Sequence, residues 1–141
     1  MKTHAAFVLK DEDGNLLFVK RSESKSTLPG AWSFPSGTKE EEETIEETAV
    51  REAKEELDLT VTFEHIAGKT DLESFGVELH FVVCSVSNEE KETLTIMDYE
   101  EIADVQWMKL EEFFRTYQDD TIGHGLVWLR THPEIASKLT S

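Results

Sequence analysis

The amino-acid sequence predicts an α/β (α+β) fold in which a mixed β-sheet carries helices on its surface. Two apolar runs, residues 4–9 and 77–86, have the composition of strands, and residues 44–57 between them have helical periodicity. Short helical patterns close the chain. This order is typical of a sheet with helices packed against it. With 141 residues, of which 38% are hydrophobic, the chain can build one core, so we expect a single domain over residues 1–141.

The first two strands are predicted to form a hairpin. Residues 4–9 are mostly apolar, residues 11–15 have the short polar side chains and the glycine of a turn, and residues 16–20 resume a strand. A short apolar piece follows at residues 31–34. Pro35, Ser36 and Gly37 are expected to end it.

Residues 44–57 form the most clearly predicted helix. Thr44 and Glu47 have the spacing of a capping box, and acids crowd the first turn, where the helix dipole favours them. An apolar stripe at helical spacing consists of Ala49, Val50, Ala53 and Leu57. We therefore expect one face of this helix to be buried.

The rest of the chain supplies two further strands, a short strand and small helices. Residues 77–86 are apolar on both faces, which is typical of a central strand. The other expected elements are a strand at 59–67, a polar loop at 87–95, a short strand at 105–108, and helical turns at 110–116, 125–131 and 133–139.

Composition excludes several classes of function. Thirty acids stand against 14 bases, a formal charge of −16, which disfavours binding to nucleic-acid polymers or anionic membranes. No apolar run reaches the roughly 18 residues that a membrane helix needs, and the N-terminus lacks the pattern of a signal peptide. The one cysteine, Cys84, cannot form an intrachain disulfide and is expected to be a buried small hydrophobe. A cytoplasmic protein is the simplest expectation.

Three acids of the long helix suggest a cation site. Glu52, Glu55 and Glu56 are spaced i, i+3 and i+4 and therefore share one face. Like charges at this spacing repel, and a divalent cation with a preference for oxygen ligands, such as Mg²⁺ or Mn²⁺, removes the conflict. The competing interpretation is a solvated glutamate-rich helix, and spacing alone does not exclude it.

A longer pattern supports the cation site. The matching positions are Gly37, Glu43, Arg51, Glu52, Glu55, Glu56 and Leu59, with Ala53 in an apolar slot. This pattern resembles the Nudix box, G-x5-E-x7-R-E-U-x-E-E-x-G-U, where U is apolar. The one departure is Asp58, which replaces a glycine at the helix C-cap and tolerates a left-handed conformation.

The resemblance extends over residues 4–113 and implies a Nudix-type α/β/α sandwich. Residues 29–37 look like the stretch that leads into the box, although Ser36 stands where most relatives have glycine. Family members often use the carbonyl of that residue as a metal ligand. Many also carry an acid near Glu101 that acts on the metal or on the water.

The resemblance implies Mg²⁺-dependent hydrolysis of a diphosphate linkage in a nucleoside diphosphate derivative. We expect a (d)NTP to be cleaved to (d)NMP and pyrophosphate, as in short enzymes that sanitise the nucleotide pool. An ADP-ribose or nucleotide-sugar pyrophosphatase is the first alternative. A catalytically silent nucleotide-sensing module is the second, although silent relatives usually lose box carboxylates that this chain keeps.

The resemblance also assigns roles to the box residues. Glu52, Glu56 and the Ser36 carbonyl are implied as metal ligands, and Glu55 as a ligand directly or through water. Glu52 and Glu101 are both candidates for the base that accepts the proton of the water. Glu43, Arg51 and Gly37 are expected to be structural, the first two as a buried ion pair.

The sequence also contains candidates for the substrate site. Lys20 and Arg21 could hold a phosphate or could be exposed charges of an edge strand. Candidates for contact with the rest of the substrate are Trp32, Phe75, Phe81, Asp119 and Asp120, although Trp32 and Phe81 suit the core and the two acids suit a turn. His80 is expected to be a core histidine. The expected partner is a small nucleotide, and a homodimer is compatible with the sequence.

Overall fold

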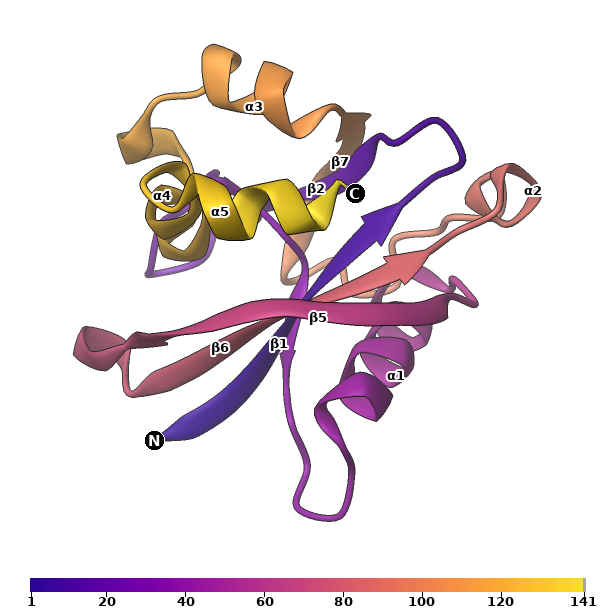
Figure 1. The fold of residues 1–141 in the computed structure, drawn as a ribbon, viewed down its shortest axis with the longest axis horizontal. Coiled ribbons are helices and arrows are strands. Elements are labelled where there is room, and N and C mark those ends of the chain that lie inside the picture. The colour runs from indigo at the N-terminus through magenta and orange to yellow at the C-terminus, as the bar shows by residue number, and fades with distance from the viewer. Residues whose placement is uncertain (141) are drawn as a thin grey trace.

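The computed structural model describes residues 1–140, which form one mixed sheet with helices on both faces (Figure 1). The strands are β1 (Lys2–Lys10), β2 (Leu16–Arg21), β3 (Trp32–Ser33), β4 (Ser36–Thr38), β5 (Thr62–Leu72), β6 (Val77–Ser85) and β7 (Ile102–Met108). The helices are α1 (Ile45–Leu57), α2 (Asn88–Lys91), α3 (Leu110–Thr116), α4 (His124–Arg130) and α5 (Pro133–Ala136), with short 3₁₀ turns at Glu73–Phe75, Asp119–Thr121 and Ser137–Leu139.

The order of strands is β3-β2-β1-β6-β5, with β4 paired to β1 and β7 paired to β2. Strand β6 lies between β1, to which it is parallel, and β5, to which it is antiparallel. The central position predicted for this apolar strand is therefore confirmed.

The predicted hairpin forms, but its two strands soon separate. Strands β1 and β2 are paired at Lys10 and Leu16, whereas the first half of β1 pairs with β4. The apolar piece ends as expected, because β3 ends at Ser33 and neither Phe34 nor Pro35 belongs to a strand. The sequence did not predict that Ser36 and Gly37 would form a new strand. The Phe7 N–H donates to the Pro35 carbonyl at 2.9 Å, and Ser36 then begins strand β4.

Two cores lie on opposite faces of the sheet. Helix α1 covers one face with buried Ala49, Ala53 and Leu57, and α3, α4 and α5 cover the other (Figure 1). This confirms the mixed-sheet α/β fold with helices on each side. Val50 was wrongly included in the buried stripe, because it is 36% exposed. One residue step of about 100° turns its side chain away from the sheet.

Both ends of α1 are capped as the sequence predicts. The Thr44 hydroxyl accepts from the Glu47 N–H at 3.2 Å, and the Glu47 carboxylate accepts from the Thr44 N–H at 2.8 Å. Asp58 adopts the left-handed conformation (φ 54°) where the family pattern has glycine. Helix termination is therefore intact despite the departure.

Two other segments differ from expectation. Strand β5 continues to Leu72 rather than ending at residue 67, because its second half pairs with the first residues of β6. The polar loop at 87–95 contains the short helix α2, whose first turn is capped by the Ser87 hydroxyl. None of the helices in residues 1–140 is both long and apolar enough to cross a membrane.

Candidate active site

Strand β4 and helix α1 meet where a glycine has no room for a side chain. A Cβ added at Gly37 would overlap Cγ and Cδ of Glu52 and would lie 2.7 Å from its Oε1. The Glu52 side chain therefore rests directly on the strand that follows the Pro35 bend. Close approach of a carboxylate to the backbone explains why this position requires glycine.

Arg51 ties the loop before α1 to the helix. Its guanidinium donates to both oxygens of Glu43, at 2.7 and 3.0 Å, and to the Thr38 carbonyl at 3.1 Å. This ion pair lowers the pKa of Glu43 to about 2 and raises the pKa of Arg51. Both charges are mostly shielded from solvent, with side-chain exposures of 25% for Arg51 and 13% for Glu43.

The same guanidinium also holds two of the predicted metal ligands. Arg51 Nη1 donates to Glu52 at 2.9 Å and to Glu55 at 3.1 Å. Glu52 is largely buried, whereas the Glu55 side chain is 58% exposed. Two of the three box carboxylates therefore differ in environment, because Glu52 faces the loop and Glu55 faces solvent.

Glu56 is the unusual carboxylate of the site. Its Oε2 is buried and has no hydrogen-bond partner. The pKa of Glu56 is raised to about 9, first by burial, then by the charge of Glu52 and a hydrogen bond with it, and then by the charges of Asp98 and Glu101. Four carboxyl groups from two segments therefore interact at this point.

Backbone hydrogen bonds hold the second segment against α1. The Met97 N–H donates to the Glu56 carbonyl at 2.8 Å, and the Thr95 N–H donates to the Leu57 carbonyl at 3.0 Å. This turn positions Asp98. The sequence did not predict a role for Asp98, because it lies in an acid-rich stretch without a motif that distinguishes it. The Glu101 carboxylate pairs with Lys25 at 2.5 Å, and Lys25 was also missed.

The residues of the site fit a divalent cation, although they are not assembled around one. An orphaned buried carboxylate oxygen beside a second carboxylate is a donor set that Mg²⁺ or Mn²⁺ prefers. Across residues 1–140, however, no three His, Cys, Asp or Glu side chains converge closely enough to hold an ion as they stand. Glu55 would have to leave Arg51 to join Glu52 and Glu56.

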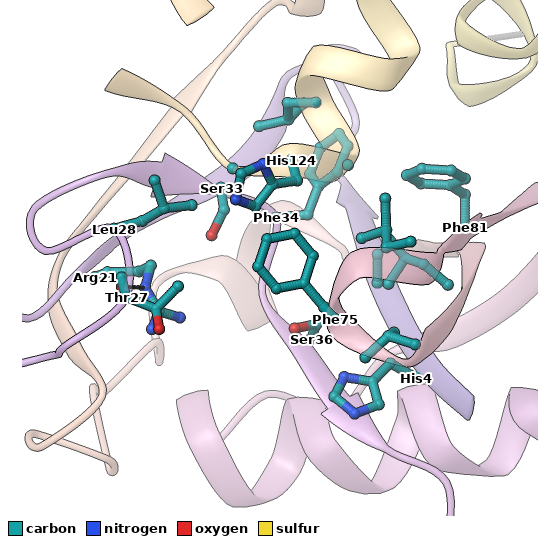
Figure 2. A pocket seen from close by; sticks show the side chains of 17 residues that line it. His4, Arg21, Thr27, Leu28, Ser33, Phe34, Ser36, Phe75, Phe81 and His124 are labelled. Atoms are coloured by element: carbon teal, nitrogen blue, oxygen red, sulfur yellow. Dashed lines mark hydrogen bonds between the residues drawn. The ribbon is translucent and has the colours of Figure 1, made fainter. Parts of the chain in front are cut away.

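A cavity of about 190 Å³ opens beside Ser36, on the sheet face opposite α1 (Figure 2). Arg21, Ser36 and Phe75 were predicted site residues and line it. Phe75 is 50% exposed and packs on His124, with ring centroids 4.5 Å apart. The remaining lining includes His4, Thr27, Leu28, Ser33, Phe34, Leu79 and Phe81.

Other predicted substrate contacts lie elsewhere. Trp32 packs on Tyr117, with ring centroids 6.2 Å apart, and does not line this cavity. Asp119 forms an ion pair with Arg130 at 2.5 Å, and both Asp119 and Asp120 border a separate surface hollow. Lys20 lies at a β-bulge of strand β2, next to Arg21.

The remaining candidates have structural surroundings. Phe81 is fully buried in the core and also borders the cavity. His80 is partly buried and lies 2.6 Å from the Glu78 carboxylate. Cys84 is buried in the core beneath α1, and burial raises its pKa to about 12.

The signals that could have identified His4, His124 and Phe34 are absent from the sequence. These residues come from β1, α4 and the turn before β4, and no spacing connects them. Lys25 was detectable only as one of the few bases near Arg21.

Comparisons with known proteins identify the family and the fold of the chain. Residues 2–128 match the NUDIX domain. The isopentenyl-diphosphate Δ-isomerase of Salmonella arizonae is 33% identical over 120 residues, which cover 79% of this chain and 65% of the isomerase. The chain therefore spans slightly less than two thirds of the length of that relative.

Solved structures show the same fold at lower identity. A mutT/nudix family protein from Listeria innocua has a TM-score of 0.71 at 19% identity, over 97% of this chain and 94% of that one. An ADP-ribose pyrophosphatase from Streptococcus suis has a TM-score of 0.60 at 20% identity, over 78% and 75% of the two chains. By its box, its fold and the match over residues 2–128, the chain belongs to the Nudix family.

Proposed function

We propose that this protein is a Mg²⁺-dependent hydrolase of a diphosphate linkage in a nucleoside diphosphate derivative. The leading reaction is cleavage of a (d)NTP to (d)NMP and pyrophosphate. One observation carries the proposal: Glu56 presents a buried, unpartnered carboxylate oxygen beside Glu52, in the register of the Nudix box. A buried carboxylate without a counter-charge is costly, and a cation removes that cost.

The proposed ligands are the carboxylates of Glu52, Glu55 and Glu56 and the carbonyl of Ser36, with Mn²⁺ able to replace Mg²⁺. The ion neutralises the diphosphate and lowers the pKa of water when it is bound. Gly37 lets Glu52 reach this place, and Arg51 orients the Glu52 carboxylate from the side.

A carboxylate must accept a proton from the attacking water. Glu52 and Glu101 are both candidates, and each accepts one strong hydrogen bond from a cation, Arg51 or Lys25. A proton acceptor must lie within hydrogen-bond reach of the water. The cation that donates a hydrogen bond to the carboxylate therefore also sets the orientation of that carboxylate.

The cavity beside Ser36 is the proposed site for the group attached to the diphosphate. Arg21 provides a guanidinium at its border, which suits a phosphate oxygen. Phe75 and His124 form an aromatic wall that suits a planar base. Trp32, Asp119 and Asp120 lie outside this cavity and are weaker candidates.

A substrate panel tests the proposal. Purified protein with Mg²⁺ is incubated with each dNTP, ADP-ribose, a nucleotide sugar and a diadenosine polyphosphate, and inorganic phosphate, pyrophosphate and monophosphate ester products are measured separately. Pyrophosphate from a dNTP supports the leading reaction, whereas two monophosphate products from ADP-ribose support the first alternative. Lack of turnover across the panel would leave the silent nucleotide-sensing module as the better account. Glu56→Gln serves as the catalytic blank.

Isomerisation of a prenyl diphosphate is a second candidate, favoured by the 33% identity to an isopentenyl-diphosphate Δ-isomerase. Moving a double bond requires one group to protonate carbon and another to remove a proton. The titratable residues that line the cavity are His4, Arg21 and His124, with no carboxyl or thiol group among them, and Cys84 lies in the core on the other face. Hydrolysis therefore suits the lining better.

The two candidates are separated by isotope exchange. Isopentenyl diphosphate is incubated with the protein and Mg²⁺ in deuterated water and followed by NMR. Deuterium on carbon or a shifted double bond would favour the isomerase, and an unchanged carbon skeleton with hydrolysis of nucleotides would favour the pyrophosphohydrolase.

A further inference from the structure

We propose that Lys25 exchanges between two anionic partners, the Glu101 carboxylate and a phosphate oxygen of the bound substrate, and that this exchange frees Glu101 to accept the proton of the attacking water. The inference rests on the proposed diphosphate hydrolysis and selects Glu101 over Glu52 as the base. Lys25 is thus a positioning residue that makes Glu101 available when substrate is present.

The Lys25–Glu101 ion pair is short but easily broken. The two charged atoms are 2.5 Å apart, and the side chains are 28% and 44% exposed. In residues 1–140, neither side chain makes another hydrogen bond or ion pair. Exposed ion pairs contribute little net free energy, so a partner of higher charge can displace the carboxylate.

Exchange requires only side-chain rotation. The Ser22 N–H donates to the Glu101 carbonyl at 3.0 Å, and the Glu101 N–H donates to the Asp98 carbonyl at 3.2 Å. The Lys25 N–H donates to the Ser22 carbonyl at 3.2 Å. These bonds hold both backbones whichever partner the Lys25 ammonium takes.

Lys25 lies in a segment that connects the border of the cavity with Glu101. Its segment borders the cavity, because Arg21, Thr27 and Leu28 line one side of it (Figure 2). On its other side, Lys25 contacts Glu101, whose charge acts on Glu56 of helix α1. A substrate with its base in the cavity and its diphosphate near α1 would place phosphate oxygens between the border of the cavity and Glu101.

The chemical step balances with Glu101 as the acceptor. Water forms a bond to phosphorus through its oxygen while one of its protons moves to the Glu101 carboxylate. The bond between that phosphorus and the bridging oxygen breaks, and the bridging oxygen leaves with the electron pair. Glu101 later returns the proton to solvent.

The test compares binding with turnover in four variants: Lys25→Met, Glu101→Gln, the double variant, and Lys69→Met. Lys69 of β5 forms an exposed pair with Glu78 of β6 at 3.5 Å, and neither residue lines the cavity, so the Lys69 variant is the matched control. Binding of methylenediphosphonate, which cannot be hydrolysed, is measured by calorimetry with Mg²⁺. Turnover is measured with the best substrate of the panel.

Exchange makes opposite predictions for the two single variants. Lys25→Met should weaken binding about 10-fold, because a phosphate contact is lost. Glu101→Gln should tighten binding about 3-fold, because Lys25 loses a competing partner, and should lower kcat about 100-fold or more. The double variant should lose the tighter binding, and Lys69→Met should match the wild type.

Two results would overturn the exchange. Weaker or unchanged binding by Glu101→Gln would mean that the ion pair only braces the two loops, and unchanged binding by Lys25→Met would mean that Lys25 does not contact the phosphate. The binding measurements keep their meaning if no nucleotide is hydrolysed, so failure of the proposed function is recognised separately.

Discussion

Replacing Glu56 by glutamine should make the metal-free protein more stable while abolishing turnover. The Glu56 carboxyl has a pKa raised to about 9 from an ordinary 4.5, chiefly by burial and by the charge of Glu52. At neutral pH the folded protein must therefore either protonate this group or hold an unfavourable charge. Glutamine has nearly the same shape and carries no charge, so this cost disappears.

The size of the effect follows from the two pKa values. At pH 7.5 the unfolded chain has Glu56 ionised, whereas the folded chain retains its proton. The difference of 3 pH units between 7.5 and 4.5 corresponds to about 4 kcal/mol, an upper limit because the pair with Glu52 shares its proton. In a chain of this size that is a rise in Tm on the order of 10 °C.

The sign can be checked with pH. Because the folded state binds the extra proton, the wild-type free energy of unfolding should fall as pH rises from about 4.5 towards 9. The Glu56→Gln variant should lack this part of the slope. Urea unfolding in EDTA at pH 5.5, 7.0 and 8.5 measures it, with Glu55→Gln as the control, since the Glu55 side chain is 58% exposed.

Added Mg²⁺ provides the second measurement. A ligand that binds only the folded state raises stability, so Mg²⁺ should stabilise the wild type and have little effect on Glu56→Gln. Turnover of the variant should fall by orders of magnitude. Parallel pH curves for the two proteins, or near-wild-type turnover by the variant, would refute this reading of Glu56.

Three further substitutions probe other parts of the site. Gly37→Ala should displace Glu52, lower kcat roughly 10- to 100-fold and weaken Mg²⁺ binding in calorimetry, and unaltered binding would show that the close contact is unimportant. Arg51→Lys should lower the free energy of unfolding by about 2 kcal/mol in urea melts, because lysine cannot make both bonds to Glu43. That pair stabilises the protein above about pH 4.5 and is lost as pH falls towards the Glu43 pKa of about 2, so the cost of Arg51→Lys should vanish in acid. Phe75→Ala should raise KM about 10-fold with less than 1 kcal/mol change in stability, since Phe75 is half exposed, and an unchanged KM would place the substrate elsewhere.

The long helix and its carboxylates were predictable because their signals are local. Capping, periodicity and the box spacing all lie within residues 37–59, and the helix forms with the expected N-cap at Thr44. The central position of β6 was predictable for a related reason, since a strand apolar on both faces must be covered on both. Val50 was wrongly predicted to be buried, because helical spacing alone does not show where the buried face of a helix ends.

The elements that were missed depend on distant partners. Strand β4 exists because the first half of β1 has an edge to pair with, and residues 68–72 extend β5 because they meet the start of β6. Neither segment has a strong strand composition of its own. Asp98 and Lys25 lie in loops whose course is fixed by backbone hydrogen bonds to other segments, and no periodicity in the sequence predicts their positions.

This contrast has a consequence for function. The carboxylates proposed to hold the cation, Glu52, Glu55 and Glu56, come from one contiguous helix, whereas the cavity beside Ser36 is lined from β1, the segments before β4, the start of β6 and α4. A change in any one of these lining segments can alter which attached group fits the cavity, without disturbing the helix. The same family includes a protein named as an isomerase, and the same fold occurs in a protein named as an ADP-ribose pyrophosphatase. An informative substrate panel must therefore vary the attached group as well as the phosphate chain, because the cavity, with Phe75, His124 and Arg21 at its wall, is the proposed site for that group.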